Sequence, residues 1–144
     1  MTLEKIATVI GILSALSAGL YFLIKEYKKE RLKLRKKLNS SWTNEGNVEG
    51  TSNETHFVDL NIQVDADDGE ITGLMKCRTL KNNQDLEDIS VNGRLKFNTA
   101  VVSFKKGKFP MGNAKIKLKN KSLKWTLITG NSEDLPKSML MWKI

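Results

Sequence analysis

The sequence predicts a single N-terminal transmembrane helix followed by an all-β domain, an antiparallel up-and-down barrel of about eight strands. Three observations predict this fold class. Residues 6–24 form an apolar run without charge, residues 25–37 form a strongly basic run, and the remaining chain alternates between apolar and polar residues in short segments. We therefore expect two domains, a membrane helix with a basic extension in residues 1–38 and a β-barrel in residues 39–144.

The apolar run is long enough to cross a membrane. Its nineteen residues make a helix of about 28 Å, against a hydrocarbon core of roughly 30 Å. Eight of the thirteen residues that follow are Lys or Arg. Such positive charge marks the cytoplasmic flank of a span, so we expect the N-terminus outside and the C-terminal domain in the cytoplasm.

Two other interpretations of the N-terminal segment stay open. A secretory signal peptide has a basic start and a cleavage site after small residues. A cut after Ser17 fits the second feature, but only Lys5 precedes the run, and the apolar stretch continues to Ile24. The letters TLE at residues 2–4 also resemble the start of a mature type IV pilin, although the basic run stands where a pilin has its secreted domain.

The formal net charge of +8 lies almost entirely beside the predicted span. Residues 25–37 carry a net charge of +6 and residues 1–24 sum to zero, which leaves +2 for residues 38–144. A DNA- or RNA-binding protein concentrates positive charge on its folded domain. We therefore expect no nucleic-acid polymer as a partner, and we expect the basic run to meet the anionic inner leaflet of the lipid bilayer.

Eight segments of the C-terminal part predict strands. The clearest is residues 56–65, where every second residue from Val58 to Val64 is apolar, as in a half-buried strand. The other seven are residues 42–48, 70–79, 89–97, 99–105, 114–119, 122–129 and 138–144. Short strands with turn signals every ten residues or so are typical of a small barrel or sandwich.

A closed barrel is expected because closure removes the exposed edges of a sheet. Gly46, Gly73 and Gly93 lie inside predicted strands and fit the sharp bends of a small barrel. The alternation of residues 89–97 places Phe97 on the same inward face as Ile89. Eight strands leave room for packed side chains or for one small ligand.

The sequence contains few candidate catalytic residues. Catalysis by a Ser–His or Cys–His pair would depend on His56, the only histidine, and no nucleophile motif accompanies it; we expect a solvated side chain there. Cys77 is the only cysteine, which excludes an intrachain disulfide, and we expect a small buried hydrophobe. Residues 65–69 predict a β-turn, since the closing glutamate of a calcium loop is missing. We expect a non-enzymatic protein without a metal or cofactor.

The predicted span carries a ridge of small residues. Ala7, Gly11, Ala15 and Gly19 recur every four residues and therefore share one side of the helix. Small residues on one ridge let two helix backbones approach closely in lipid. A chain with one span has no second span of its own to pack against, so the ridge predicts self-association or a membrane partner.

Tryptophans and arginines are the candidate ligand residues of the predicted barrel. Trp42 and Trp125 fall on the first and seventh strands, where they form either part of the core or a platform on which a nucleobase stacks. Trp142 falls on the eighth strand, beside the other two in a closed barrel, so the core interpretation predicts a shared cluster of all three tryptophans. Arg78 and Arg94 are the two arginines of the domain, and a guanidinium binds phosphate well, although strand alternation places both opposite the apolar face.

The layout resembles that of a bacterial group, the small CBASS antiphage effectors that join transmembrane helices to a β-barrel and are called minimal STING-like effectors. The residues that carry the likeness are Ser41, Trp42, Glu45, Gly46, Val91, Asn92, Gly93, Leu123, Lys124, Trp125, Leu135 and Pro136. The better-known members have two membrane helices, whereas one is visible here.

The resemblance implies a function in antiviral defence. In such proteins the barrel senses a cyclic dinucleotide, and the membrane segment oligomerises and disrupts the bacterial inner membrane. For this chain it implies a cyclic nucleotide as regulatory ligand, with Trp42 or Trp125 stacking on a base and Arg78 or Arg94 meeting a phosphate. A membrane-tethered scaffold or immunity-type protein with a passive anchor, and an exported lipocalin-like binder of apolar ligands, remain alternatives.

Overall fold

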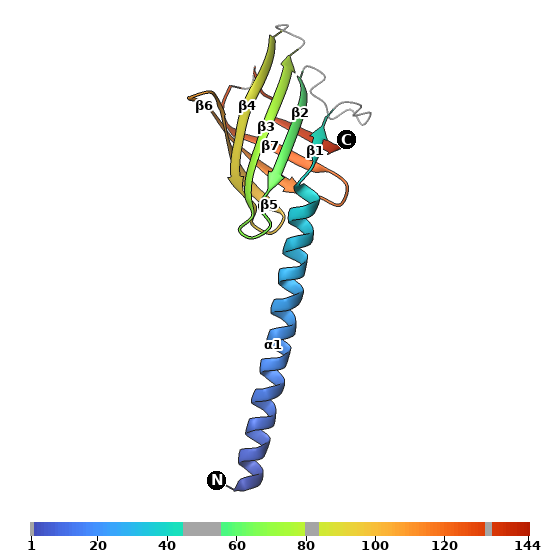
Figure 1. Cartoon of the computed structure of the whole chain (residues 1–144), viewed down its shortest axis with the longest axis vertical. Helices are drawn as coiled ribbons and strands as arrows, with labels where there is room; N and C mark the ends of the chain where they lie inside the picture. The colour runs from blue at the N-terminus through green and yellow to red at the C-terminus, as the bar shows by residue number, and fades with distance from the viewer. Residues whose placement is uncertain (1, 45–55, 80–83, 132–133) are drawn as a thin grey trace. The chain divides into compact units, whose positions relative to one another are not determined.

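The computed structural model describes residues 2–44, 56–79, 84–131 and 134–144, and in them one long helix and eight strands (Figure 1). Helix α1 covers Leu3–Leu38. The strands are β1 (Ser41–Thr43), β2 (His56–Val64), β3 (Glu70–Thr79), β4 (Gln84–Arg94), β5 (Thr99–Lys106), β6 (Phe109–Leu118), β7 (Leu123–Thr129) and β8 (Ser138–Lys143). By their internal contacts, residues 1–33 and residues 34–144 form two separate compact units.

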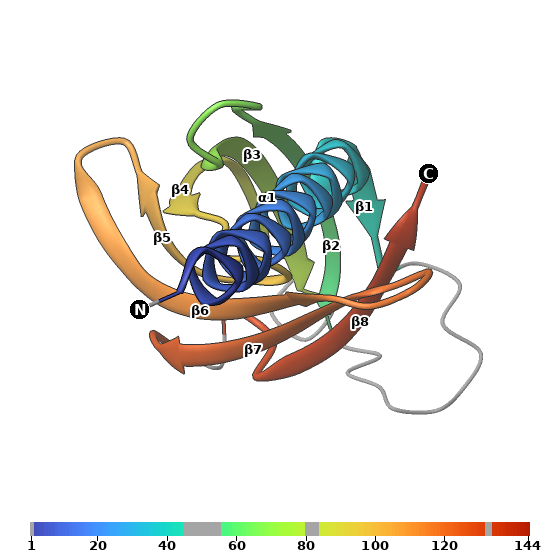
Figure 2. The ribbon, with the colours of Figure 1, turned by 90° about the horizontal axis from the view of Figure 1, so that it is seen from below.

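The strands form a closed antiparallel barrel in which each strand pairs with the next along the chain. Strand β1 pairs with β8 through Trp42 opposite Lys143, which closes the ring (Figure 2). The predicted fold class is therefore confirmed, a single apolar N-terminal helix followed by an eight-stranded up-and-down barrel. Among the described residues, β1 pairs with three residues of β2 and two of β8.

The inward face of the barrel is filled with large apolar side chains. Burial alternates along β2, where Val58, Leu60 and Ile62 are buried and the residues between them are exposed. The largest fully buried side chains are Trp42, Trp125 and Phe104. This period-two pattern is the one from which the strands were predicted, because successive side chains of a strand point to opposite faces.

The connections between α1 and β1, β2 and β3, β4 and β5, and β6 and β7 lie together at one end of the barrel, which we call the α1 end. Hydrogen bonds tie neighbouring turns there. The amide of Leu95 donates to the carbonyl of Gly69 at 2.9 Å, and the amide of Leu118 donates to that of Asn98 at 2.7 Å. The turns therefore follow one another around this end in chain order.

The last turn of α1 is part of the barrel unit, which begins at Leu34. Leu38 is fully buried in the barrel core. Arg35 is also buried, and its guanidinium donates hydrogen bonds to the carbonyl of Ala66 and, at 2.9 Å, to that of Asp67 in the turn between β2 and β3. This turn needs a glycine at position 69, which has a φ of +74° and on which a Cβ would lie 3.0 Å from the Nε atom of Arg35.

Replacing Arg35 with glutamine is expected to lower the free energy of unfolding of the barrel by about 2 kcal/mol, since hydrogen bonds from a charged group contribute about this much and the two carbonyls lose their donor. Lys36→Gln, which removes the same charge from an exposed neighbour, is the matched control and should change little. Urea unfolding of the full-length chain in detergent, followed by circular dichroism, measures both variants. Equal losses would show that the Arg35 contacts contribute nothing specific.

Both boundaries of β4 differ from those predicted. Strand β4 starts at Gln84 instead of residue 89, because Asp88 adopts a φ of +57° and the register shifts beside it, which breaks the alternation in the sequence. The same strand ends at Arg94, so the inward position predicted for Phe97 is wrong. That residue has a φ of +56° in the turn after β4, and 48 % of its surface is exposed.

Strand β6 starts at Phe109 instead of residue 114. Pro110 and Gly112 are typical of a turn, and so the sequence predicted a later start. In the structure their segment still pairs with β5, across an irregularity in the register. Strand β1 is shorter than predicted over the residues described. The predicted continuation through residues 45–48, including the bend at Gly46, lies outside them. At Gly73 and Gly93 neighbouring strands approach so closely that a Cβ would clash with the carbonyl oxygens of Asn61 and Val101, respectively.

Candidate functional site

The structure places the two candidate stacking tryptophans in the barrel core. Trp42 and Trp125 have no exposed surface. The indole N–H of Trp42 donates to the carbonyl of Leu38 at 3.0 Å, and that of Trp125 donates to the carbonyl of Pro136 at 3.1 Å. Trp125 also packs on Phe104 with a distance of 5.6 Å between ring centroids. Both rings serve the core here, and neither presents a face on which a base could stack.

Trp142 has the opposite orientation to its strand neighbours. Met139 and Met141 of β8 are buried, whereas Trp142 between Met141 and Lys143 is half-buried. A cluster of all three tryptophans is therefore not formed on the inward face, because Trp142 has the outward parity of β8.

The two arginines point outward at opposite ends of the β3–β4 pair. Arg78 stands opposite Asp85 in the register of the two strands, and Arg94 stands opposite Glu70. Eight residues of β3 separate the two positions, which is about 26 Å of strand. The four predicted ligand residues are thus divided between the core and two distant surface positions, and the structure does not bring them together.

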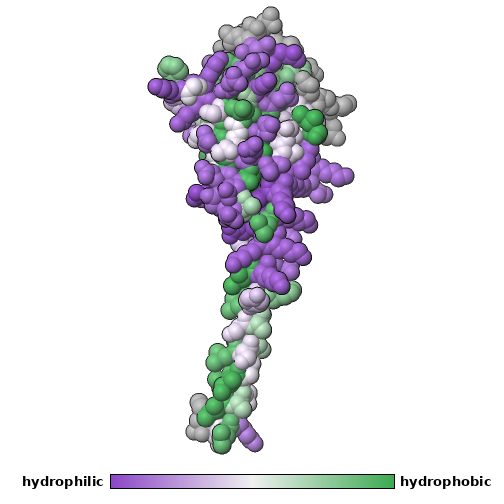
Figure 3. Space-filling model, in the orientation of Figure 1, coloured by the Kyte–Doolittle hydropathy of each residue, from purple (hydrophilic) through white to green (hydrophobic). Residues whose placement is uncertain are grey.

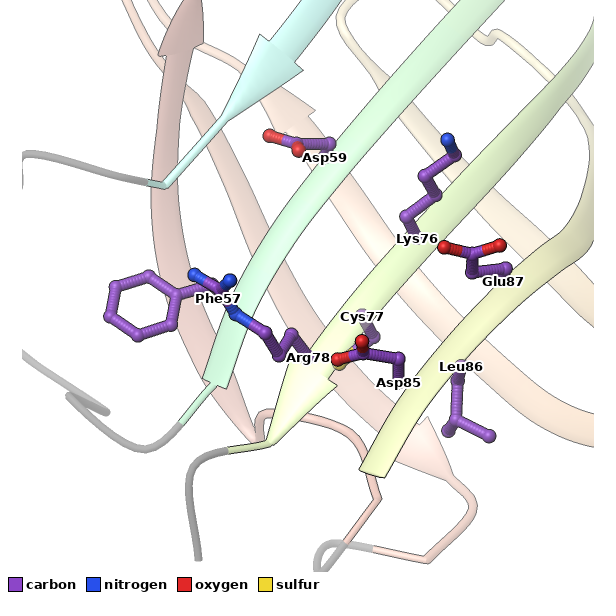
Figure 4. Close-up of a pocket in the computed structure, with 8 residues that line it drawn as sticks. All are labelled: Phe57, Asp59, Lys76, Cys77, Arg78, Asp85, Leu86 and Glu87. Carbon is purple, nitrogen blue, oxygen red and sulfur yellow. The ribbon is translucent and has the colours of Figure 1, made fainter. Parts of the chain in front are cut away.

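A cleft of about 180 Å³ lies on the outside of the barrel beside Arg78 (Figure 4). It is formed where the register of β3 and β4 shifts between Met75 and Cys77. The guanidinium of Arg78 lies over the ring of Phe57 at 5.3 Å from its centroid. The cleft therefore combines the predicted Arg78 with an aromatic ring, Phe57, that the sequence did not single out.

The cleft is lined by charges of both signs. Lys76 stands opposite Asp59 in register, and Arg78 stands opposite Asp85, while Glu87 completes the lining. A phosphate at Arg78 would have to compete with the carboxylate of Asp85. The lining therefore offers partners for ligand groups of either charge.

Cys77 reaches the cleft from the core side of β3. Its thiol is almost fully buried and donates a hydrogen bond to the carbonyl of Asp134 at 3.3 Å. Burial, with a smaller contribution from the charge of Asp134, raises the pKa of the Cys77 thiol to about 12. The thiol is therefore neutral at physiological pH, which confirms the prediction of a small buried hydrophobe and argues against a nucleophile.

His56 is buried at the start of β2 with 7 % of its surface exposed, so the prediction of a solvated histidine is wrong. The inward positions of β2 begin at this residue, one period before Val58.

Within the part of the chain that the structure describes, no three His, Cys, Asp or Glu side chains are grouped so that they could hold a metal ion. Residues 65–69 form the predicted turn. In it the carboxylate of Asp65 accepts hydrogen bonds from the backbone amides of Asp67 and Asp68. These hydrogen bonds lower the pKa of Asp65 below its usual value.

A lysine-rich surface covers β5, β6 and β7. The net charge summed over the whole domain did not reveal it. Residues 99–131 contain eight lysines and no Asp or Glu. All eight lysines are exposed. They are Lys105, Lys106, Lys108, Lys115, Lys117, Lys119, Lys121 and Lys124. The net charge of +2 for the whole domain hid this segment, and a charge count strand by strand would have found it.

Helix α1 has one segment apolar and long enough to cross a membrane. Figure 3 shows apolar side chains along its N-terminal part and hydrophilic ones over the barrel. The ridge residues Ala7, Gly11, Ala15 and Gly19 are all exposed in the chain by itself. A Cβ added at Gly11 or Gly19 would meet nothing within 4 Å, so this surface is open to another helix.

No protein-family model matches the chain, and no characterised protein or solved structure matches it either. The helix, the cleft and the charged surfaces are the features of the chain that bear on its function.

Proposed function

We propose that this chain is a membrane-anchored effector of the bacterial inner membrane, with its N-terminus outside and its barrel in the cytoplasm. The barrel recognises a cyclic nucleotide, and α1 associates through the ridge of Ala7, Gly11, Ala15 and Gly19 and disrupts the membrane. The observation that carries the proposal is the continuity of α1, which is one helix from the apolar run to Leu38 in the barrel core.

Continuity of the helix supports a coupled element over a passive tether. Residues 20–38 contain neither Gly nor Pro, the residues that commonly break or bend a helix. The last turn is held by Leu38 in the core and by Arg35 on the turn between β2 and β3. A ligand that changes the packing of the barrel at these two residues therefore acts directly on the helix that enters the membrane.

The cleft beside Arg78 is the place where we propose that the nucleotide binds. An aromatic ring stacks on a base, and a guanidinium donates two hydrogen bonds to a phosphate. Phe57 and Arg78 supply these two groups side by side. Trp42 and Trp125 remain part of the buried core.

Calorimetry of the full-length chain in detergent against a panel of cyclic di- and trinucleotides tests the sensor. We expect saturable heat with at least one nucleotide. Arg78→Gln should weaken that binding about tenfold or more, because it removes a charge-assisted hydrogen bond. Arg94→Gln, the same substitution at the far end of the β3–β4 pair about 26 Å away, should leave nucleotide binding unchanged. The absence of heat with every nucleotide would refute the sensor, and a larger effect of Arg94→Gln would refute the site.

A membrane-tethered protein-binding scaffold is the second candidate function, and the mixed charge of the cleft favours it. Asp59, Asp85 and Glu87 stand beside Lys76 and Arg78, and complementary charges of both signs are a means of selecting protein partners. A passive anchor should be tolerated when the chain is overproduced, whereas a membrane-disrupting effector should arrest growth. A reporter fused to the C-terminus separates both functions from an exported binder, which would place the reporter in the periplasm.

A further inference from the structure

The hairpin of β6 and β7 places like charges directly opposite each other. Lys117 pairs with Lys124 in the register of the two strands, and both side chains are exposed. The residues on their other sides are Thr99 of β5 and Leu140 of β8, so neither neighbouring strand supplies a carboxylate. Like charges directly opposite in a sheet are destabilising. Neither of the two flanking strands therefore compensates the charge of this pair.

The opposite side of the barrel is built differently. On β2, β3 and β4, the pairs Asp59 and Lys76, Arg78 and Asp85, and Glu70 and Arg94 place opposite charges across from each other. The lysines of the β6–β7 hairpin have no ion-pair partner among the residues that the structure describes. The two sides thus differ within the described residues, where the β2–β4 side places opposite charges across from each other and the hairpin does not.

The hairpin also lies at the α1 end of the barrel. Its turn carries Lys119 and Lys121, and the amide of Lys119 donates to the carbonyl of Ser122 at 2.8 Å. The acidic turn of residues 65–70 belongs to the same end, but the turn between β4 and β5 stands between it and the hairpin, as the hydrogen bonds from Leu95 and Leu118 show. Positive and negative charge are therefore separated around this end.

We propose that the hairpin lysines, Lys117, Lys119, Lys121 and Lys124, bind the phosphate groups of anionic lipids in the membrane that α1 enters. The proposal rests on α1 as a membrane span, but not on recognition of a nucleotide. Fourteen residues of chain connect Ile24, the end of the apolar run, to Leu38. In the helix that they form they span about 21 Å, so the barrel stays near the lipid surface.

Electrostatic attraction then decides which side of the barrel meets the lipid. Near an anionic leaflet, each lysine raises the occupancy of a bound position about fivefold. The acidic turn of residues 65–70 is repelled by the same surface. The barrel is thereby held with the β6–β7 hairpin toward the headgroups and the β2–β3 turn away from them, which leaves the cleft beside Arg78 accessible from the cytoplasm.

Lysine acylation of the full-length chain in lipid nanodiscs tests the proposal. Neutral discs contain phosphatidylcholine alone, and anionic discs contain about one-third phosphatidylglycerol. We expect acylation of the hairpin lysines, read by mass spectrometry, to fall about fivefold or more in anionic discs and to recover when salt of about 0.5 M screens the attraction. Lys76 on the opposite side and Lys105 at the other end should react equally in both discs.

A pair of variants with equal charge separates the hairpin from the rest of the lysine surface. One variant replaces Lys117, Lys119, Lys121 and Lys124 with glutamine, and the control replaces Lys105, Lys106, Lys108 and Lys115. With a spin-labelled lipid headgroup in anionic discs, backbone signals of residues 118–123 should be broadened in the native chain and in the control. The broadening should be lost in the hairpin variant, and its persistence there would overturn the proposal.

The remaining outcomes distinguish this proposal from the proposed function. A chain that does not elute with neutral discs lacks the membrane anchor, which refutes the proposed function together with this inference. A chain that elutes with the discs but shows equal acylation in neutral and anionic lipid refutes only the lipid contact. Protection of the hairpin lysines in neutral discs by inorganic phosphate or a cyclic nucleotide would assign them to a soluble anion and would also overturn it.

Discussion

Replacing Gly11 and Gly19 together with leucine is expected to abolish the crosslinked oligomers and the growth arrest on overproduction that we propose for the full-length chain. The two glycines stand in the ridge of small residues on α1, and a Cβ at either position meets nothing within the chain itself. Leucine there should leave the single chain intact but hold a partner helix away, since close approach of two backbones requires small residues at the contact.

The matched control adds bulk on the other side of the same helix. Val9 and Leu13 lie roughly opposite the ridge at 100° per residue, and phenylalanine at both positions should preserve oligomers and growth arrest. Membrane extraction and protein level are measured for every variant. Growth arrest that persists in the glycine variant would refute the ridge as the working contact, and equal losses in both double variants would attribute the effect to bulk anywhere on the span.

Replacing Trp125 with alanine is expected to lower the free energy of unfolding of the barrel by about 3–5 kcal/mol, the usual cost of removing a buried tryptophan. The indole is fully buried, packs on Phe104 and donates a hydrogen bond to the carbonyl of Pro136. A domain of this size is stable by only about 5–15 kcal/mol. Denaturant unfolding of the full-length chain in detergent, followed by the β-sheet signal in circular dichroism, measures the loss.

Two further substitutions keep this test decisive if Trp125→Ala leaves the barrel unfolded. Trp125→Phe retains a ring beside Phe104 but leaves the Pro136 carbonyl without its donor, and we expect a loss of about 1–3 kcal/mol. Trp142→Ala, at a half-buried outward position, should cost about 1 kcal/mol. If Trp125→Ala reduced nucleotide binding and left stability unchanged, Trp125 would be a stacking residue and its assignment to the core would fail.

The predicted ligand residues show what the alternation within one strand can and cannot predict. Trp125 shares its parity with Leu123 and Leu127, so the alternation already placed its ring on the apolar face, as the structure shows. The same alternation placed Arg78 and Arg94 on the outside. It carried no information on which strands face each other, and so it could not show that both arginines stand opposite carboxylates.

The cleft and the burial of Arg35 could not be predicted from the sequence, for related reasons. The cleft depends on a register shift between β3 and β4 and on the left-handed φ of Asp88, which interrupts the pattern from which a strand is recognised. Arg35 belongs to a run of lysines and arginines that predicts a solvated, membrane-facing segment. Its burial follows from contact with a turn more than thirty residues away along the chain.

The sequence by itself determined the apolar helix, the number of strands and the inward residues of most of them, because these depend on the length of an apolar run and on a period of two within one segment. Only the tertiary structure decided which charges are compensated. Lys117 and Lys124 are ordinary surface lysines when each strand is considered alone, and they become an unpaired positive surface only when the register of β6 and β7 sets them opposite each other. Pairing between strands joins residues that are distant along the chain, so its electrostatic consequences exist only once the barrel has closed.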